Sequence, residues 1–187
     1  MSLGKVDWSE LPSPIDDGGS DHLTSTTMPP VSLPATNGSR IDVSALSGIS
    51  VIYIYPMTGR PDTPLPDGWD TIPGARGCTP QSCAFRDHLK ELGKHGVNQL
   101  FGLSTQSTAY QQEAVERLHL PYALLSDEQL ELQRALRLPT MTVDDVTLLK
   151  RLTLIIENNR ITKVFYPVFP PDENAISVID WLENSRV

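Results

Sequence analysis

The segment from Ile49 to Tyr55 constrains the fold more than any other part of the chain. It reads Ile-Ser-Val-Ile-Tyr-Ile-Tyr, almost wholly apolar and rich in β-branched residues. Such a run is typical of a strand that is covered on both faces, because a half-exposed strand would alternate apolar and polar residues. The segment therefore predicts a central strand in an α/β protein.

The flanking segments predict a mixed central β-sheet flanked by helices. The Asn37-Gly38 pair between two short β-like runs indicates an N-terminal β-hairpin within residues 31–43. Asn158-Asn159 indicates a second tight turn. Apolar periodicity and capping residues, including Ser107 and Asp172, predict helices at 80–95, 107–118, 129–136 and 172–184, and further strands at 97–103, 122–125, 152–157 and 161–166.

The composition fits one globular domain preceded by an irregular segment. The chain has 187 residues, of which 39% are hydrophobic and 20% charged. Residues 4–30 mix proline, glycine, serine and acidic residues with little periodicity, so we expect an extended N-terminal arm at 1–30 before a domain at 31–187. The net charge of −8 argues against nucleic-acid and anionic membrane partners. Without a spanning apolar run or a signal-peptide pattern, we expect a cytoplasmic protein.

Both cysteines of the chain, Cys78 and Cys83, lie at the expected start of a helix. Free backbone N–H groups and the positive end of the helix dipole favour a thiolate there. Five helical steps separate two Cα atoms by about 8.7 Å, whereas a disulfide normally needs less than about 7 Å. A permanent structural bridge is therefore disfavoured, and a transient catalytic disulfide would require the helix start to unwind.

We expect neither a metal nor an organic cofactor. The cysteines and histidines that lie close together in the sequence do not have the spacings of zinc sites; they are Cys78, Cys83, His88 and His95. The chain also lacks a glycine-rich phosphate loop. Residues 56–73 form a loop with five prolines, which we expect Trp69 to anchor.

Three segments resemble the signature segments of peroxiredoxins, and most of all those of the peroxiredoxin Q (bacterioferritin-comigratory) subgroup. They are Tyr53-Ile54-Tyr55-Pro56, the run from Gly77 to Asp87 (Gly-Cys-Thr-Pro-Gln-Ser-Cys-Ala-Phe-Arg-Asp), and the run from Lys150 to Glu157 (Lys-Arg-Leu-Thr-Leu-Ile-Ile-Glu). The likeness spans roughly residues 29–184. It implies a thioredoxin-like fold.

The resemblance also implies an activity, that of a thiol-dependent peroxidase acting on hydrogen peroxide and organic hydroperoxides. Cys78 would be the peroxidatic thiolate, Cys83 would resolve its sulfenic acid as an intramolecular disulfide, and Arg151 would match the active-site arginine. Thioredoxin or a similar dithiol would recycle the enzyme, as a monomer or weak homodimer. The same cysteine pair leaves open a thiol–disulfide oxidoreductase acting on proteins, or a non-catalytic redoxin-like binding module.

The sequence departs from the family where peroxide is bound. The family has a threonine three residues before the nucleophile, and here that position is Ala75. Thr71, Thr58 and Thr79 are the candidate replacements. Either Pro56, with about 15 extra residues before Cys78, or Pro73 would be the family proline.

Candidate contacts to the substrate and to the thiolate complete the expected site. Gly77 leaves room beside the nucleophile and is therefore one candidate substrate-binding residue. Thr71, as a possible replacement for the family threonine, is the other. Arg76 and Arg86 either tune the thiolate or are solvated.

Overall fold

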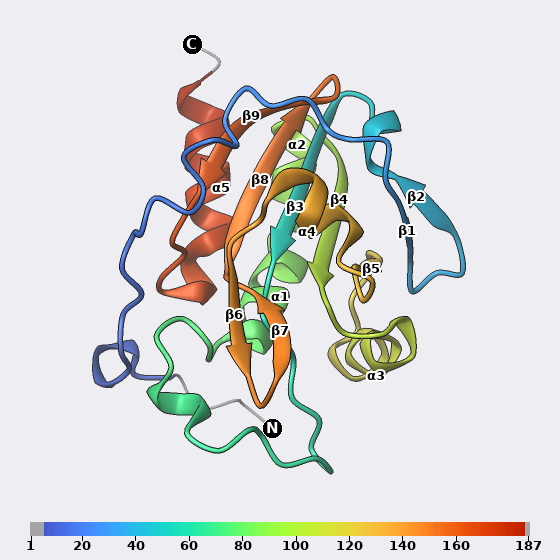
Figure 1. The fold of residues 1–187 in the computed structure, drawn as a ribbon. Helices are drawn as coiled ribbons and strands as arrows, with labels where there is room; N and C mark the ends of the chain where they lie inside the picture. The colour runs from blue at the N-terminus through green and yellow to red at the C-terminus, as the bar shows by residue number, and fades with distance from the viewer. Residues whose placement is uncertain (1–5, 186–187) are drawn as a thin grey trace.

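A five-stranded mixed sheet forms the centre of the computed structural model, which describes residues 6–185 (Figure 1). The strand order is β5-β4-β3-β8-β9, so β3 is central, as predicted. β3 pairs in parallel with β4 and antiparallel with β8. The strands are β3 Ile49–Ile54, β4 Val97–Ser104, β5 Leu124–Ser126, β8 Leu152–Glu157 and β9 Arg160–Phe165.

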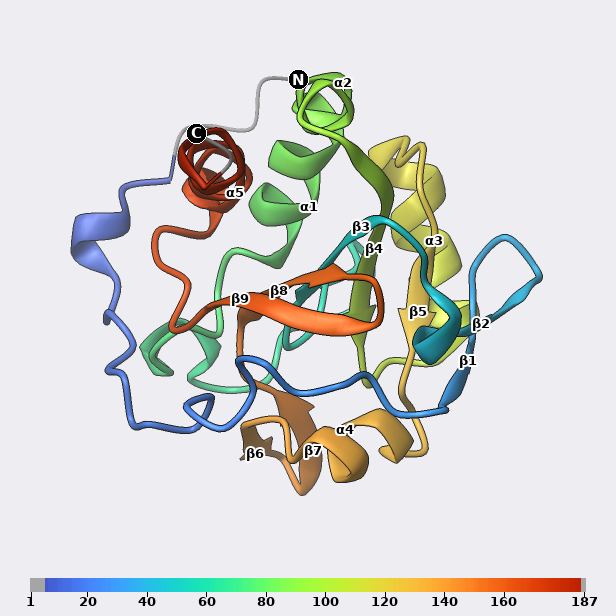
Figure 2. The ribbon, with the colours of Figure 1, turned by 90° about the horizontal axis from the view of Figure 1, so that it is seen from above.

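Both faces of the sheet are covered, which explains the apolar sequence of β3. Val51 and Tyr53 pack with the helices on one face, whereas Ile52 and Ile54 pack into a separate core on the other. Figure 2 shows α1, α2 and α5 on the first face and α4 on the second. The helices are α1 Cys78–Asp87, α2 Leu89–Lys94, α3 Thr108–Leu118, α4 Glu131–Leu136 and α5 Asn174–Asn184.

The predicted tight turns are confirmed. β1 Ser32–Pro34 pairs antiparallel with β2 Arg40–Asp42, and Gly38 between them has φ +83°. Asn158 and Asn159 between β8 and β9 have φ of +47° and +67°. Asparagine and glycine tolerate this left-handed backbone better than other residues, so these sequences select the turns. Ser107 also caps α3, because its hydroxyl accepts from the N–H of Tyr110.

One hairpin was missed by the sequence analysis, and two predictions were wrong in detail. The hairpin of β6 Thr140–Val143 and β7 Val146–Leu149 was not predicted, although its turn at residues 144–145 carries two aspartates with positive φ. The helix expected at 80–95 is two helices that break at His88. Asp172 does not cap the last helix, because a 3₁₀ turn, η4 Pro171–Glu173, precedes it and α5 begins at Asn174.

The described part of the N-terminal arm is attached to the domain. Leu23 and Met28 are buried in the core that α4 also covers. Asp17 accepts hydrogen bonds from Lys150 Nζ at 2.6 Å and from the Tyr166 hydroxyl at 2.7 Å. Residues 1–30 as a unit separate from a domain at 31–187 stay a prediction, and residues 1–5 lie outside the described chain. Among the described residues, no helix is long and apolar enough to cross a membrane.

Candidate active site

Cys78 is the first residue of α1 and is only 4% exposed. The preceding residue, Gly77, has φ +111°, a conformation that side chains with a Cβ rarely adopt. A Cβ at this position would overlap Cγ of Pro171 and would lie 3.0 Å from Cη2 of Trp8. Glycine therefore lets the chain turn sharply into the helix and lets two rings pack against the turn.

The buried side chain of Arg151 contacts Cys78 on the side that faces the protein interior. Arg151 directly precedes β8, is 3% exposed, and its Nη2 lies 3.2 Å from Cys78 Sγ. The same nitrogen is 3.1–3.3 Å from the carbonyl oxygens of residues 74, 75 and 76. A guanidinium is always charged and is a donor only, so this arrangement stabilises negative charge on the sulfur.

A buried chain of amides fixes the guanidinium. Gln81, one helical turn after the nucleophile, accepts a hydrogen bond from Arg151 Nη1 through its Oε1. Its Nε2 donates to Asn174 Oδ1 at 3.0 Å, and Thr153 Oγ1 donates to the same oxygen at 2.6 Å. All four side chains are buried. α1, α5 and β8 thus jointly position the charge beside the sulfur.

Cys78 and Cys83 line one cavity of about 700 Å³, together with Gly77 and Thr79. Cys83 is half-buried, and burial raises the pKa of its thiol above the ordinary value, an effect that the nearby Arg86 partly offsets. Both cysteines are free thiols, and α1 is helical from one to the other. Forming a bond between them therefore requires the first turn of α1 to unwind.

Two tyrosines, one of them on β3, hold the end of the first turn of α1 in place. The Tyr122 hydroxyl donates to the carbonyl oxygen of Ser82 at 2.7 Å, and the Tyr53 hydroxyl donates to Ser82 Oγ at 3.0 Å. Tyr53 also stacks on Phe85, with ring centroids 4.6 Å apart. α1 is therefore held firmly from Ser82 onward.

Arginines and aromatic rings surround the cavity. Trp8 and Trp69 contribute apolar wall, and Trp69 is 4% exposed, consistent with a role in anchoring the loop. The four arginines of the lining are Arg60, Arg76, Arg86 and Arg117. Arg76 pairs with Asp70 at 2.6 Å and Arg86 with Asp87 at 2.8 Å, whereas Arg60 and Arg117 share Glu113, at 4.0 Å and 2.6 Å.

The structure distinguishes the threonine candidates. Thr79 lies in the cavity lining with Cys78. Thr58 is buried, with its N–H and hydroxyl directed to Gln106 Oε1. Thr71 is exposed, donates its hydroxyl to the carbonyl oxygen of Gly68 at 2.6 Å, and is not among the described residues that line the cavity.

The segment around the missing threonine has its own packing. Ala75, at the family's threonine position, is buried, and its carbonyl oxygen accepts from Arg151. Pro56 is buried two residues after the end of β3, whereas Pro73 is exposed in the loop. This placement favours Pro56 as the family proline.

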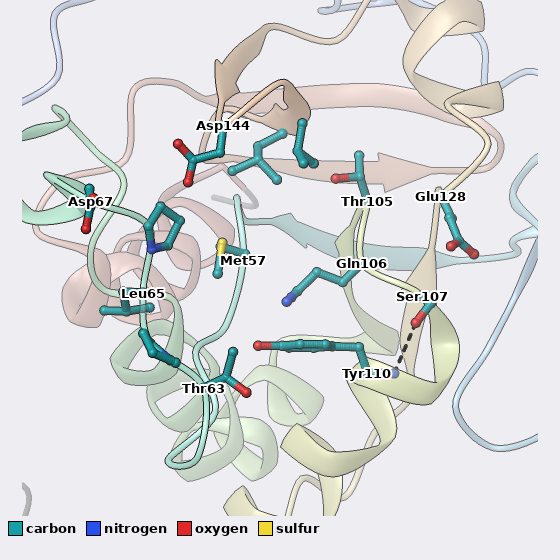
Figure 3. A pocket seen from close by; sticks show the side chains of 14 residues that line it. Met57, Thr63, Leu65, Asp67, Thr105, Gln106, Ser107, Tyr110, Glu128 and Asp144 are labelled. Carbon is teal, nitrogen blue, oxygen red and sulfur yellow. Dashed lines mark hydrogen bonds between the residues drawn. The ribbon is translucent and has the colours of Figure 1, made fainter.

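A second cavity, of about 560 Å³, is lined in part by the proline-rich loop (Figure 3). Met57 and Leu65 line both cavities, so the loop is a shared wall. Tyr110 and Gln106 approach this cavity from the side opposite Leu65. Neither cysteine lines it.

Sequence reasoning missed Gln81, Asn174 and Trp8. Gln81 carries a local signal, because a residue three positions after Cys78 shares its helix face. Asn174 carries no local signal, because it bonds to Gln81 from 93 residues away in the sequence. Trp8 carries none either, because it lies in a segment without periodicity.

Comparison with known proteins agrees with this geometry. "Peroxiredoxin Q, chloroplastic" of Sedum lineare is 27% identical over 163 residues, which cover 86% of this chain and 78% of the relative. "Peroxiredoxin Bcp" of Escherichia coli is 34% identical over 101 residues, which cover 54% of each chain. The crystal structure of the peroxidoxin BcpB from Mycobacterium tuberculosis superposes with a TM-score of 0.71 at 24% identity, covering 89% of this chain and all of the other.

A cysteine at a helix start, a buried arginine behind it and a thioredoxin-like sheet define a redox protein of the redoxin class. Residues 23–179 match the family model described as Redoxin, so the chain belongs to that family. Within it, relatives and structural neighbours carry the names peroxiredoxin Q and Bcp, which confirms the resemblance found in the sequence.

Proposed function

We propose that this protein is a thiol peroxidase that reduces hydrogen peroxide and organic hydroperoxides. The observation that carries the proposal is the 3.2 Å contact between Arg151 Nη2 and Cys78 Sγ, at a helix start that opens into a cavity. The arginine and the first helical N–H groups supply positive charge where peroxide oxygen would become negative.

In the first step, the Cys78 thiolate would attack one oxygen of the hydroperoxide and break the O–O bond. The sulfur becomes a sulfenic acid, and the other oxygen leaves with a proton as water or an alcohol. The N–H groups of Cys78 and Thr79 have no acceptor within α1, because they belong to its first turn. They would therefore be available to a peroxide in the cavity that Cys78 and Thr79 line. The space beside Gly77 is filled by Pro171 and Trp8, so Gly77 shapes the turn and leaves no room for the substrate there.

In the second step, Cys83 would resolve the sulfenic acid. Its sulfur bonds to Cys78 Sγ, and the hydroxyl leaves with the thiol proton as water. The raised pKa of Cys83 suits this order, because its thiol stays protonated while Cys78 reacts first. An external dithiol, for which we propose thioredoxin, would reduce the disulfide in a reducing compartment such as the cytoplasm.

Intact mass of the reduced protein, quenched within a second of adding near-stoichiometric hydrogen peroxide, tests both steps. Loss of two hydrogens, mapped to Cys78 and Cys83, is expected. Cys78→Ser should abolish turnover, whereas Cys83→Ser should keep one reaction with peroxide and lose thioredoxin-supported cycling. Equal loss of the first oxidation in both variants would refute these roles.

The two free thiols on one cavity also suit a competing function, a thiol–disulfide oxidoreductase that acts on proteins. The same cysteine pair would then exchange with a substrate disulfide instead of attacking peroxide. Insulin reduction without fast peroxide consumption would support it. Slow reaction with both substrates would instead favour a non-catalytic redoxin-like module.

A further inference from the structure

We call the four residues before the nucleophile, 74–77, the lead-in segment. Other parts of the chain contact it on two sides. On the inside, Arg151 Nη2 contacts the carbonyl oxygens of residues 74–76. On the outside lies the N-terminal arm. Trp8 packs over Gly77, and Pro14 Cβ lies 3.3 Å from the place where a Cβ of Gly74 would be. The lead-in segment cannot move far unless one of these contacts opens.

The position of Trp8 is defined by its neighbours. Asp7 caps the 3₁₀ turn η1 Trp8–Glu10, accepting from the N–H of Ser9 at 3.0 Å. The indole ring meets Phe169 edge to face, with centroids 6.1 Å apart. Further along the arm, Asp17 binds Lys150 and Tyr166. This part of the arm precedes residue 23, where the match to the family model begins.

Disulfide formation must disturb this arrangement. Cys78 and Cys83 are too far apart while α1 is wound, and Ser82 is anchored through Tyr122. The movement therefore falls on the first turn of α1 and on the lead-in segment. Trp8 packs on Gly77, which joins the two. An opening that carries Gly77 with it breaks that contact.

We propose that Trp8 is a positioning residue that slows the resolving step, an inference that rests on the proposed peroxidase function. The Cys78 sulfenic acid has two fates. Attack by the Cys83 thiol gives the disulfide and water, whereas a second hydroperoxide gives the sulfinic acid and an alcohol or water. By holding the turn wound, Trp8 lengthens the life of the sulfenic acid. The arm thereby sets how easily the enzyme is overoxidised.

Rapid-quench experiments on Trp8→Ala and Trp8→Phe test this role. Reduced protein is mixed with one equivalent of hydrogen peroxide, the sulfenic acid is trapped with dimedone, and the disulfide is followed by intact mass. Disulfide formation should be roughly two- to tenfold faster in Trp8→Ala, the factor expected for losing an aromatic contact. Trp8→Phe keeps a ring but has no counterpart of Cη2, the indole atom nearest Gly77, so it should resolve at a rate between those of wild type and Trp8→Ala. With a hundredfold excess of peroxide, the fraction gaining two oxygens should fall in Trp8→Ala.

Asp17→Asn tests the same effect on disulfide formation at a distance from the cysteines. It weakens the contacts of the arm with Lys150 and Tyr166, and Asp17 does not line the cavity. Loosening the arm there should accelerate disulfide formation by a smaller factor, while the first oxidation stays within about twofold of wild type. If Trp8→Ala does not fold, as judged by circular dichroism, this variant decides. Equal rates of disulfide formation in wild type, Trp8→Ala and Asp17→Asn would overturn the inference alone. Wild-type protein that forms neither sulfenic acid nor disulfide would instead overturn the proposed function.

Discussion

Replacing Gly77 with alanine should destabilise the protein strongly, for two separable reasons. The backbone at φ +111° is costly for any residue with a Cβ, by about 1–3 kcal/mol. The new methyl group would also overlap Pro171 Cγ and lie 3.0 Å from Trp8 Cη2. Overpacking of this kind costs about 1–3 kcal/mol. The sum is roughly 4 kcal/mol, a large part of the 5–15 kcal/mol that typically stabilises a domain.

Gly38→Ala is the matched control, because Gly38 has φ +83° and no heavy atom within 4 Å of a built Cβ. It should lose only the backbone cost, about 1–2 kcal/mol. Thermal unfolding followed by circular dichroism measures both. For a chain of this size, each kcal/mol lowers Tm by about 2–4 °C, so we expect about 8–16 °C for Gly77→Ala and about 2–8 °C for Gly38→Ala. Equal losses in the two variants would refute the contribution of Pro171 and Trp8.

Two further predictions concern the buried amide chain and the arm. Gln81→Leu removes the acceptor of Arg151 Nη1, so the first oxidation of Cys78 by hydrogen peroxide, followed by stopped flow, should slow by roughly ten- to a hundredfold. Gln112→Leu, at a glutamine of α3 outside the cavity lining, is the control and should leave the rate unchanged. Equal rates in the two variants would contradict the positioning role of Gln81. Lys150, then Tyr166 and the Gly19 N–H, hold the pKa of Asp17 well below its ordinary value of about 3.9. This stabilisation is complete above that value and is lost as the pH falls below it, so the Tm difference between wild type and Asp17→Asn should shrink from pH 6 to pH 3. A difference that stays constant over that range would show that the carboxylate charge is irrelevant.

Local sequence signals predicted most of the fold. The apolar run of β3 requires cover on both faces, and the Asn37-Gly38 and Asn158-Asn159 turns follow from residues that tolerate positive φ. The β6–β7 hairpin was missed because its two aspartates are less specific turn formers. The last helix was placed two residues early, because Asp172 resembles a cap but lies within a 3₁₀ turn that begins at Pro171.

The candidate site likewise combines residues that local sequence signals predict with residues that only the folded chain brings together. Cys78, Cys83 and Gly77 are close in sequence, and the structure places them in one cavity. Arg151 lies 73 residues away and was found only through family resemblance. Contacts made by Asn174 and Trp8 depend on how a distant helix and an irregular arm pack, which no periodicity encodes.

The long loop between Pro56 and Cys78 bears on how proteins of this kind can be recognised, with Pro56 taken as the counterpart of the family proline. About 15 extra residues roughly triple the separation of the two anchor points, and closing the longer chain costs only about 1 kcal/mol of entropy. Burying the side chain of Trp69, which is 4% exposed, offsets this with a few kcal/mol. The number of residues between proline and nucleophile is therefore nearly free to vary. A search that demands fixed spacing would overlook such chains, whereas one that seeks the buried strand end, the cysteine helix and the later arginine as independent anchors would retain them.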